Sequence, residues 1–156
     1  MNHLDKNDQV HMVDVSSKSD SLRAAVASTK VQMQLSTKKA IEENQIKKGN
    51  VLTVARIAGI MAVKKTAEII PLCHSIPIHG VTIDFEFITE QELKITAEVK
   101  TIGVTGVEME ALTSVSVAAL TIYDMCKSID RGMTIGPTKL EQKSGGVSGM
   151  FVNTKS

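Results

Sequence analysis

The segment from Gly106 to Lys127, GVEMEALTSVSVAALTIYDMCK, constrains the fold of this chain more than any other. It begins with two carboxylates, Glu108 and Glu110, and continues through an uncharged middle at 111–121. It ends with a charged pair, Asp124 and Lys127. A helix that is apolar all round is buried on every side. Buried ionisable groups must pair, shift their pKa or take part in chemistry. The charged ends of this predicted helix are therefore the first place to look for a functional site.

The two ends of this helix are too far apart to reach one small molecule. From Glu110 to Asp124 is fourteen residues, which places them near one face but about 21 Å apart along the axis. Two interpretations are open. The helix is buried, with a capped start and an ion-paired end, or a second copy of the chain supplies the other half of a shared site. The uncharged middle favours the second, because one subunit of 156 residues rarely surrounds such a helix.

Length and composition narrow the classes of protein. The chain has room for one domain, which we expect over 11–143, between a flexible tail at 1–10 and a flexible glycine-rich tail at 144–156. Aromatic residues make up 3% and the net charge is +1. Both observations argue against nucleic-acid binding, which uses aromatic stacking and basic surfaces. Cys73 and Cys126 have no paired spacing, so we expect neither a metal site nor a disulfide.

No apolar run approaches the length of a membrane span, because Lys64 and Lys65 interrupt the longest one. The polar N-terminus lacks an apolar signal segment. We therefore expect a cytoplasmic protein without a membrane partner.

Hydrophobic periodicity predicts an α+β fold. Alternation indicates strands, and we place them at 11–15, in the later part of 23–35 (VQMQL, 31–35), and at 81–88, 93–102 and 133–142. Helices are predicted at 37–45, with Ser36 as a cap, at 51–70, where Pro71 ends the helix, and at 106–128. The strands 81–88 and 93–102 should form a hairpin. The order matches the β-α-β-β-α-β pattern of a ferredoxin-like sandwich, an antiparallel sheet with helices on one face.

Three groups of polar residues are candidates for chemistry. Asp124 and Lys127 share a helix face, and they form either a surface salt bridge or an acid–base pair. His74, in the loop after the second helix, is either a proton carrier or an ordinary surface histidine. Several cations near turns are either solvated or clamp a phosphorylated small molecule: Arg23, Lys47, Lys48, Arg56, Lys64, Lys65 and Lys143.

Six strings in this chain occur together and in order: HMVDV at 11–15, ARIAGI at 55–60, IPLCH at 70–74, TGVEMEALT at 105–113, ALTIYDMCK at 119–127 and KSGG at 143–146. With these strings, the sequence from His11 to Gly149 resembles the MoaC family, the cyclic pyranopterin monophosphate synthases of molybdenum cofactor biosynthesis. The combination of GVEMEALT and LTIYDMCK is highly specific for that family.

The resemblance implies a lyase that converts 3′,8-cyclo-7,8-dihydroguanosine 5′-triphosphate to cyclic pyranopterin monophosphate and pyrophosphate. It implies Asp124 and Lys127 as the catalytic pair. The substrate-binding residues that match the family, or fall on polar positions around its pocket, are Leu72, Cys73, His74, Glu108, Met109, Glu110, Lys48 and Lys64. It also implies a homohexamer, a trimer of dimers with active sites shared between chains. No cofactor is expected, although Mg²⁺ can accompany the triphosphate.

The chain departs from the family pattern at three places. Val104 and Val147 stand where many members have lysine, and Ser75 follows the histidine where many have proline. Two other classes of protein are consistent with the fold alone. A nucleotide sensor would need the phosphate clamp but no acid–base pair, and a structural subunit would leave His74, Glu110 and Asp124 without a common pocket.

Overall fold

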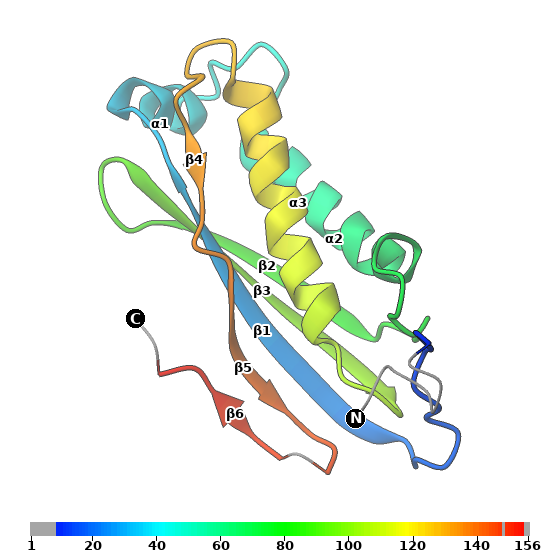
Figure 1. The fold of residues 1–156 in the computed structure, drawn as a ribbon. Helices are drawn as coiled ribbons and strands as arrows, with labels where there is room; N and C mark the ends of the chain where they lie inside the picture. The colour runs from blue at the N-terminus through cyan, green and yellow to red at the C-terminus, as the bar shows by residue number, and fades with distance from the viewer. Residues whose placement is uncertain (1–8, 148, 155–156) are drawn as a thin grey trace.

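The computed structural model describes residues 9–147 and 149–154. Its centre is an antiparallel sheet with the strand order β2-β3-β1-β5-β6, and β4 also pairs with β1. The strands are β1 (Ser21–Gln32), β2 (Gly80–Phe87), β3 (Glu92–Gly103), β4 (Thr134–Ile135), β5 (Lys139–Ser144) and β6 (Phe151–Val152). The helices are α1 (Leu35–Glu42), α2 (Val51–Ile69) and α3 (Glu108–Cys126). Figure 1 shows α2 and α3 side by side on one face of the sheet.

This topology confirms the predicted ferredoxin-like α+β sandwich. The hairpin of β2 and β3 is paired from Gly80 opposite Lys100 to Phe87 opposite Leu93. In β3 every second side chain is fully buried, at Leu93, Ile95, Ala97 and Val99. Alternation of this kind indicates one face in the core and one outside it. The buried face of β3 therefore meets the helices, and the long helices are held at fixed positions over the sheet.

The two long helices approach closely at Gly59 of α2. A β-carbon at this position would lie 2.6 Å from Cδ1 of Ile83 and 3.2 Å from the backbone oxygen of Ser114 on α3. Only glycine fits such a contact without a shift of its neighbours. Gly59 therefore sets how near α2 and α3 come to each other.

Four local predictions were wrong. The strand predicted at 31–35 lies earlier, as β1 from Ser21 to Gln32, and Leu35 already begins α1. Residues 11–15 form no strand, because the carbonyl of Val13 accepts a hydrogen bond from the His74 ring instead of a sheet partner. Ser36 does not cap α1: the helix starts at Leu35, and Gln34 occupies the cap position without a side-chain cap. The last strand is interrupted between β4 and β5, where Pro137 has no N–H to donate to a sheet.

The structure describes only part of the two expected tails. Most of the segment 1–10 lies outside the described residues. Within 144–156, Phe151 and Val152 form β6 and pair with Lys143 and Gln142 of β5. The flexibility of both tails stays a prediction.

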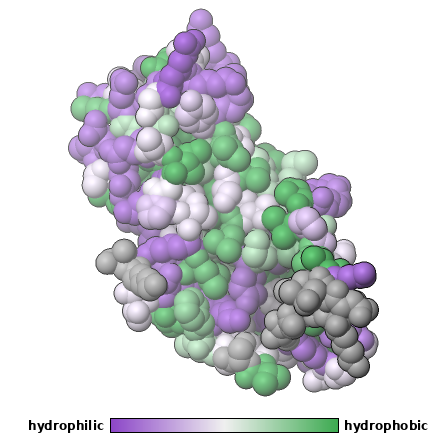
Figure 2. Space-filling model, viewed as in Figure 1, coloured by the Kyte–Doolittle hydropathy of each residue, from purple (hydrophilic) through white to green (hydrophobic). Residues whose placement is uncertain are grey.

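Large apolar side chains remain exposed on the helical layer. Ile57 and Met61 on α2 are 54% and 58% exposed, and Leu120 on α3 is 58% exposed. In Figure 2 hydrophobic residues reach the surface among polar ones over the middle of the molecule. The single chain thus buries the side of α3 that faces the sheet and α2, but it does not surround the helix.

Candidate functional site

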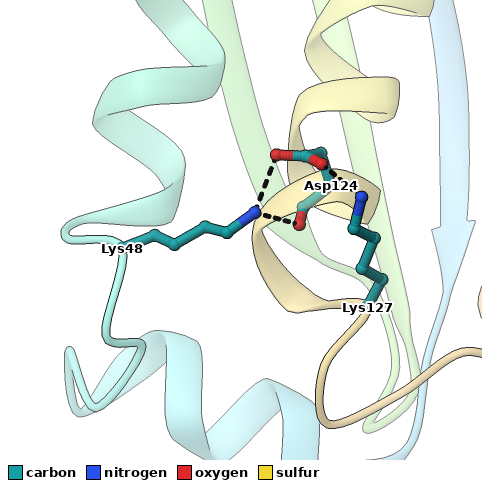
Figure 3. A network of polar contacts seen from close by, with 3 residues as sticks. All are labelled: Lys48, Asp124 and Lys127. Atoms are coloured by element: carbon teal, nitrogen blue, oxygen red, sulfur yellow. Dashed lines mark hydrogen bonds and ion pairs between the residues drawn. The ribbon is translucent and has the colours of Figure 1, made fainter.

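Three charged side chains meet at the C-terminal end of α3 (Figure 3). Nζ of Lys127 lies 2.7 Å from Oδ1 of Asp124. Nζ of Lys48 donates to Oδ2 of Asp124 at 2.9 Å and to its backbone oxygen at 2.8 Å. Lys48 comes from the loop between α1 and α2, so residues far apart in sequence converge here. The predicted Asp124–Lys127 pair is present, and Lys48 makes it a cluster of three.

The electrostatics of this cluster fix its charges near neutral pH. Hydrogen bonds from Lys127 and Lys48, together with their positive charges, lower the pKa of Asp124 to about 2. The hydrogen bond and charge of Asp124 in turn raise the pKa of Lys127. Lys127 is therefore an ammonium group at neutral pH, and it can donate a proton or stabilise a negative charge. About half of each side chain is exposed, so the cluster is open to a ligand and adds little to stability.

A pocket of about 310 Å³ lies at the opposite end of α3. The loop after α2, the start of α3 and the segment before β1 contribute its walls. It is lined by Val13, Val15, Leu72, Cys73, His74, Thr105, Gly106, Glu108, Met109 and Glu110. The structure thus brings together the predicted segments 72–74 and 108–110, which are far apart in the sequence.

Burial favours the protonated forms of two groups in this pocket. Glu110 is only 4% exposed, and burial, with a smaller effect of the nearby Glu108, raises its pKa. Burial also raises the pKa of the Cys73 thiol, and the charges of Glu110 and Glu108 add to this effect. Cys73 therefore stays a neutral thiol rather than a nucleophilic thiolate. With its raised pKa, Glu110 keeps its proton to a higher pH than an exposed glutamate does.

His74 is held in place by a backbone group. Its Nε2 lies 2.7 Å from the carbonyl oxygen of Val13. Because a carbonyl oxygen only accepts, Nε2 must carry the proton. In the neutral ring Nδ1 is then the remaining acceptor. The same contact fastens the segment before β1 against the pocket.

A basic groove of about 520 Å³ adjoins the pocket and shares Thr105, Gly106 and Glu108 with it. Its remaining lining residues are Lys18, Arg23, Lys143 and Val147. Nζ of Lys143 lies 2.8 Å from Oε1 of Glu108, so the groove and the pocket are connected through an ion pair. A groove lined by three cationic side chains can bind a polyanion.

Glycines after β5 bring the chain over this groove. Gly145 and Gly146 have positive φ angles of 92° and 72°. A β-carbon on Gly146 would overlap the Arg23 guanidinium, at 2.1 Å from Nη1. The sequence KSGG therefore has a physical role, since it lets the backbone cross Arg23 closely.

The predicted site residues fall into two groups rather than one. Asp124, Lys127 and Lys48 lie at one end of α3, and the pocket residues lie at the other, about 21 Å away for fourteen residues of helix. Lys64 is exposed on α2 and lines none of the described cavities near either group.

Sequence reasoning did not single out Val13, Val15, Thr105 or Lys18. The only signal for Val13, Val15 and Thr105 was their position within the strings HMVDV and TGVEMEALT, and Lys18, three residues after Val15, had none. Among residues 9–147 and 149–154, no three His, Cys, Asp or Glu side chains gather as a metal site. In the same residues no helix is long and apolar enough to cross a membrane.

The sequence of this chain matches a known protein family. The MoaC family model matches residues 12–146. The chain belongs to the MoaC family. The match spans both ends of α3, the pocket and most of the basic groove, so the geometry described above is that of a MoaC family member.

Curated relatives cover almost the whole chain. A cyclic pyranopterin monophosphate synthase of Brevibacillus brevis is 54% identical over 151 residues, 97% of this chain and 94% of the relative. Proteins of the same name from Desulfitobacterium hafniense and Clostridium botulinum are 51% and 53% identical, each over 97% of this chain and over 93% and 96% of the relative.

Proposed function

We propose that this protein is a cyclic pyranopterin monophosphate synthase of molybdenum cofactor biosynthesis. It converts 3′,8-cyclo-7,8-dihydroguanosine 5′-triphosphate to cyclic pyranopterin monophosphate and releases pyrophosphate, as a lyase. Membership of the MoaC family and relatives of this name at about half identity over nearly full length support the assignment. The cytoplasmic location expected from the sequence is part of the proposal.

The observation that carries the chemistry is the cluster at the end of α3. The reaction opens a purine-derived ring, rebuilds it as a pterin and closes a cyclic phosphate. In the last step a sugar hydroxyl oxygen bonds to the α-phosphorus, the bond to the β-phosphate oxygen breaks, and the hydroxyl proton passes to a base. Lys127, as an ammonium group held by Asp124, donates a proton or stabilises developing negative charge. Lys48 provides a second positive charge beside it.

The pocket and the groove supply the binding functions. Glu110 and Glu108 accept hydrogen bonds from the N–H groups of a guanine-like ring. Leu72, Cys73, His74 and Met109 complete the walls around it. The triphosphate lies along Arg23, Lys143 and Lys18, whose charges offset those of the phosphates.

The separation of the two groups on α3 supports a site built from two chains. One small substrate cannot contact both ends of a rigid helix of nineteen residues. The pocket of one subunit therefore meets the Asp124 end of a partner, within a homohexamer arranged as a trimer of dimers.

Incubation with the cyclic GTP-derived triphosphate tests the proposal. We expect stoichiometric release of pyrophosphate and of cyclic pyranopterin monophosphate, measured by a coupled pyrophosphate assay and by mass spectrometry. Tight binding without turnover would contradict it and indicate a nucleotide-binding protein. A parallel assay with EDTA determines whether Mg²⁺ accompanies the triphosphate.

A further inference from the structure

A buried carboxylate lies next to the charged cluster but outside it. Asp130, in the turn after α3, is 2% exposed. Its Oδ2 accepts hydrogen bonds from the backbone N–H of Gln34 at 2.8 Å and from Oγ1 of Thr37 at 3.0 Å. Its Oδ1 accepts from the backbone N–H of Gly132 at 3.2 Å. A buried carboxylate with three donors is tied firmly to its surroundings.

These bonds place Asp130 at the start of α1. Gln34 is the residue before the first helical turn, and no side chain of α1 itself caps this end or provides an acidic group there. The helix N-terminus carries partial positive charge, which favours an anion. Asp130 thus takes the role of a cap from ninety-six residues away in the sequence. The turn that follows α3 is seen against α1 in Figure 1.

Short hydrogen-bonded connections link both ends of α1 to the cluster. From Asp130 the backbone returns to α3 through bonds of Asp130 N and Ile129 N to the Cys126 carbonyl at 3.1 and 2.9 Å, next to Lys127. At the far end of α1, the loop that carries Lys48 is closed by a bond of 2.7 Å between the side chains of Asn50 and Asn44.

We infer that Asp130 is a positioning residue that fixes the distance between Lys48 and Lys127 on either side of Asp124. Lys127 is connected to Lys48 through Asp130, α1 and the loop after α1. Because both lysines also bond Asp124, these connections form a closed ring. α1 is only eight residues long, so a shift at its start is transmitted to the loop at its end. Both lysine side chains are about half exposed, and the backbone on which they stand therefore decides where their charges lie.

The consequence for turnover rests on the proposed function. Misplacement of a catalytic group by about 1 Å can cost about a hundredfold in rate. Substrate binding depends mainly on the pocket and the groove at the other end of α3. Loss of Asp130 should therefore lower kcat more than it raises KM.

The variant Asp130→Asn tests this inference, because it keeps the size of the side chain but loses one acceptor and the charge. Two quantities are measured on the full chain: the pKa of the Asp124 carboxyl group by NMR titration, and kcat and KM. We expect the Asp124 pKa to rise from about 2 toward its ordinary value of 3.8 and kcat to fall about tenfold or more. As a control for loss of stability, Ile95→Ala in the sheet core, where Ile95 is fully buried, should leave both quantities unchanged.

A second pair of variants serves if Asp130→Asn does not fold. Thr37→Val removes the hydroxyl donor and retains Asp130, whereas Thr37→Ser retains the donor. We expect Thr37→Val to shift the Asp124 pKa upward and Thr37→Ser to keep the wild-type value. An unchanged Asp124 pKa in both Asp130→Asn and Thr37→Val overturns the inference. The titration needs no substrate, so a shift in a protein without turnover would support the positioning role while the proposed function fails.

Discussion

At the scale of single residues, Lys127 is the most direct test of chemistry. We expect Lys127→Ala to lower kcat by about 10²–10⁴, because alanine can neither donate a proton nor stabilise negative charge. The fold should survive, since the side chain is 53% exposed. Lys65→Ala is a matched control, because Lys65 also pairs with a carboxylate three residues away and is 58% exposed. Steady-state kinetics and circular dichroism measure both effects, and near-normal activity of Lys127→Ala would reduce the pair to a salt bridge.

Glu110 makes a separate prediction about stability and pH. Burial raises its folded-state pKa above the ordinary 4.5, so the folded protein binds this proton more tightly than the unfolded chain does. The free energy of unfolding therefore falls as pH rises from the unfolded pKa through the raised one. Glu110→Gln has no carboxyl group to titrate, so it does not lose stability in this way as pH rises. Its free energy of unfolding relative to that of wild type should therefore increase between the unfolded-state and the folded-state pKa of Glu110. Urea denaturation at about pH 4 and pH 8 measures it, and a difference independent of pH would refute the assignment.

At the scale of elements, the contact between α2 and α3 depends on the missing side chain at Gly59. Alanine is normally favoured over glycine in a helix by about 1 kcal/mol. At this position the added methyl group meets Ile83 and the Ser114 backbone, and we expect Gly59→Ala to destabilise the protein by about 1–3 kcal/mol. Chemical denaturation measures the change. Thr53→Ala, on an exposed position of the same helix, is a control that tests whether any substitution in α2 has this effect.

Some of the helices and strands could be predicted from the sequence, whereas others could not. The long helices and the β2–β3 hairpin follow from local periodicity, which is complete within each segment. The start of α1 does not, because its capping group is Asp130, from beyond α3. The same holds for the site. Asp124 and Lys127 are neighbours on one helix, whereas the approach of Lys48 and the contact of His74 with Val13 depend on tertiary folding.

At the scale of the whole molecule, the exposed apolar side chains on the helical layer predict self-association. We expect a hexamer, or at least a dimer, in which Ile57 becomes buried, because large exposed apolar groups mark interfaces. Ile57→Asp should weaken the assembly, and Ile57→Leu should preserve it. Sedimentation at micromolar concentration measures the mass of each, and a stable monomer for the wild type would refute the prediction.

A shared site also predicts complementation between inactive subunits. If Glu110 and Asp124 serve one site from different chains, a mixed dimer of Glu110→Gln and Asp124→Asn contains one intact site. Equal mixing with full exchange makes about half of the dimers mixed, so activity should recover to roughly a quarter of wild type. A mixture that exchanges subunits, as verified by mass spectrometry of differently labelled chains, and yet stays inactive would place both residues in one chain or in separate sites.

The central place of β1 in the sheet has a consequence for synthesis on the ribosome. This strand leaves the exit tunnel early, but its partners β3, β4 and β5 are made much later. Until then the nascent chain exposes both edges of a strand of twelve residues, a template for pairing with other chains. The cap on α1 is also missing until Asp130 has been translated. The strand β1 therefore gains a neighbour on its second edge only after β4 and β5 have been made, and we expect chaperones that shield nascent strands to raise the yield of this protein.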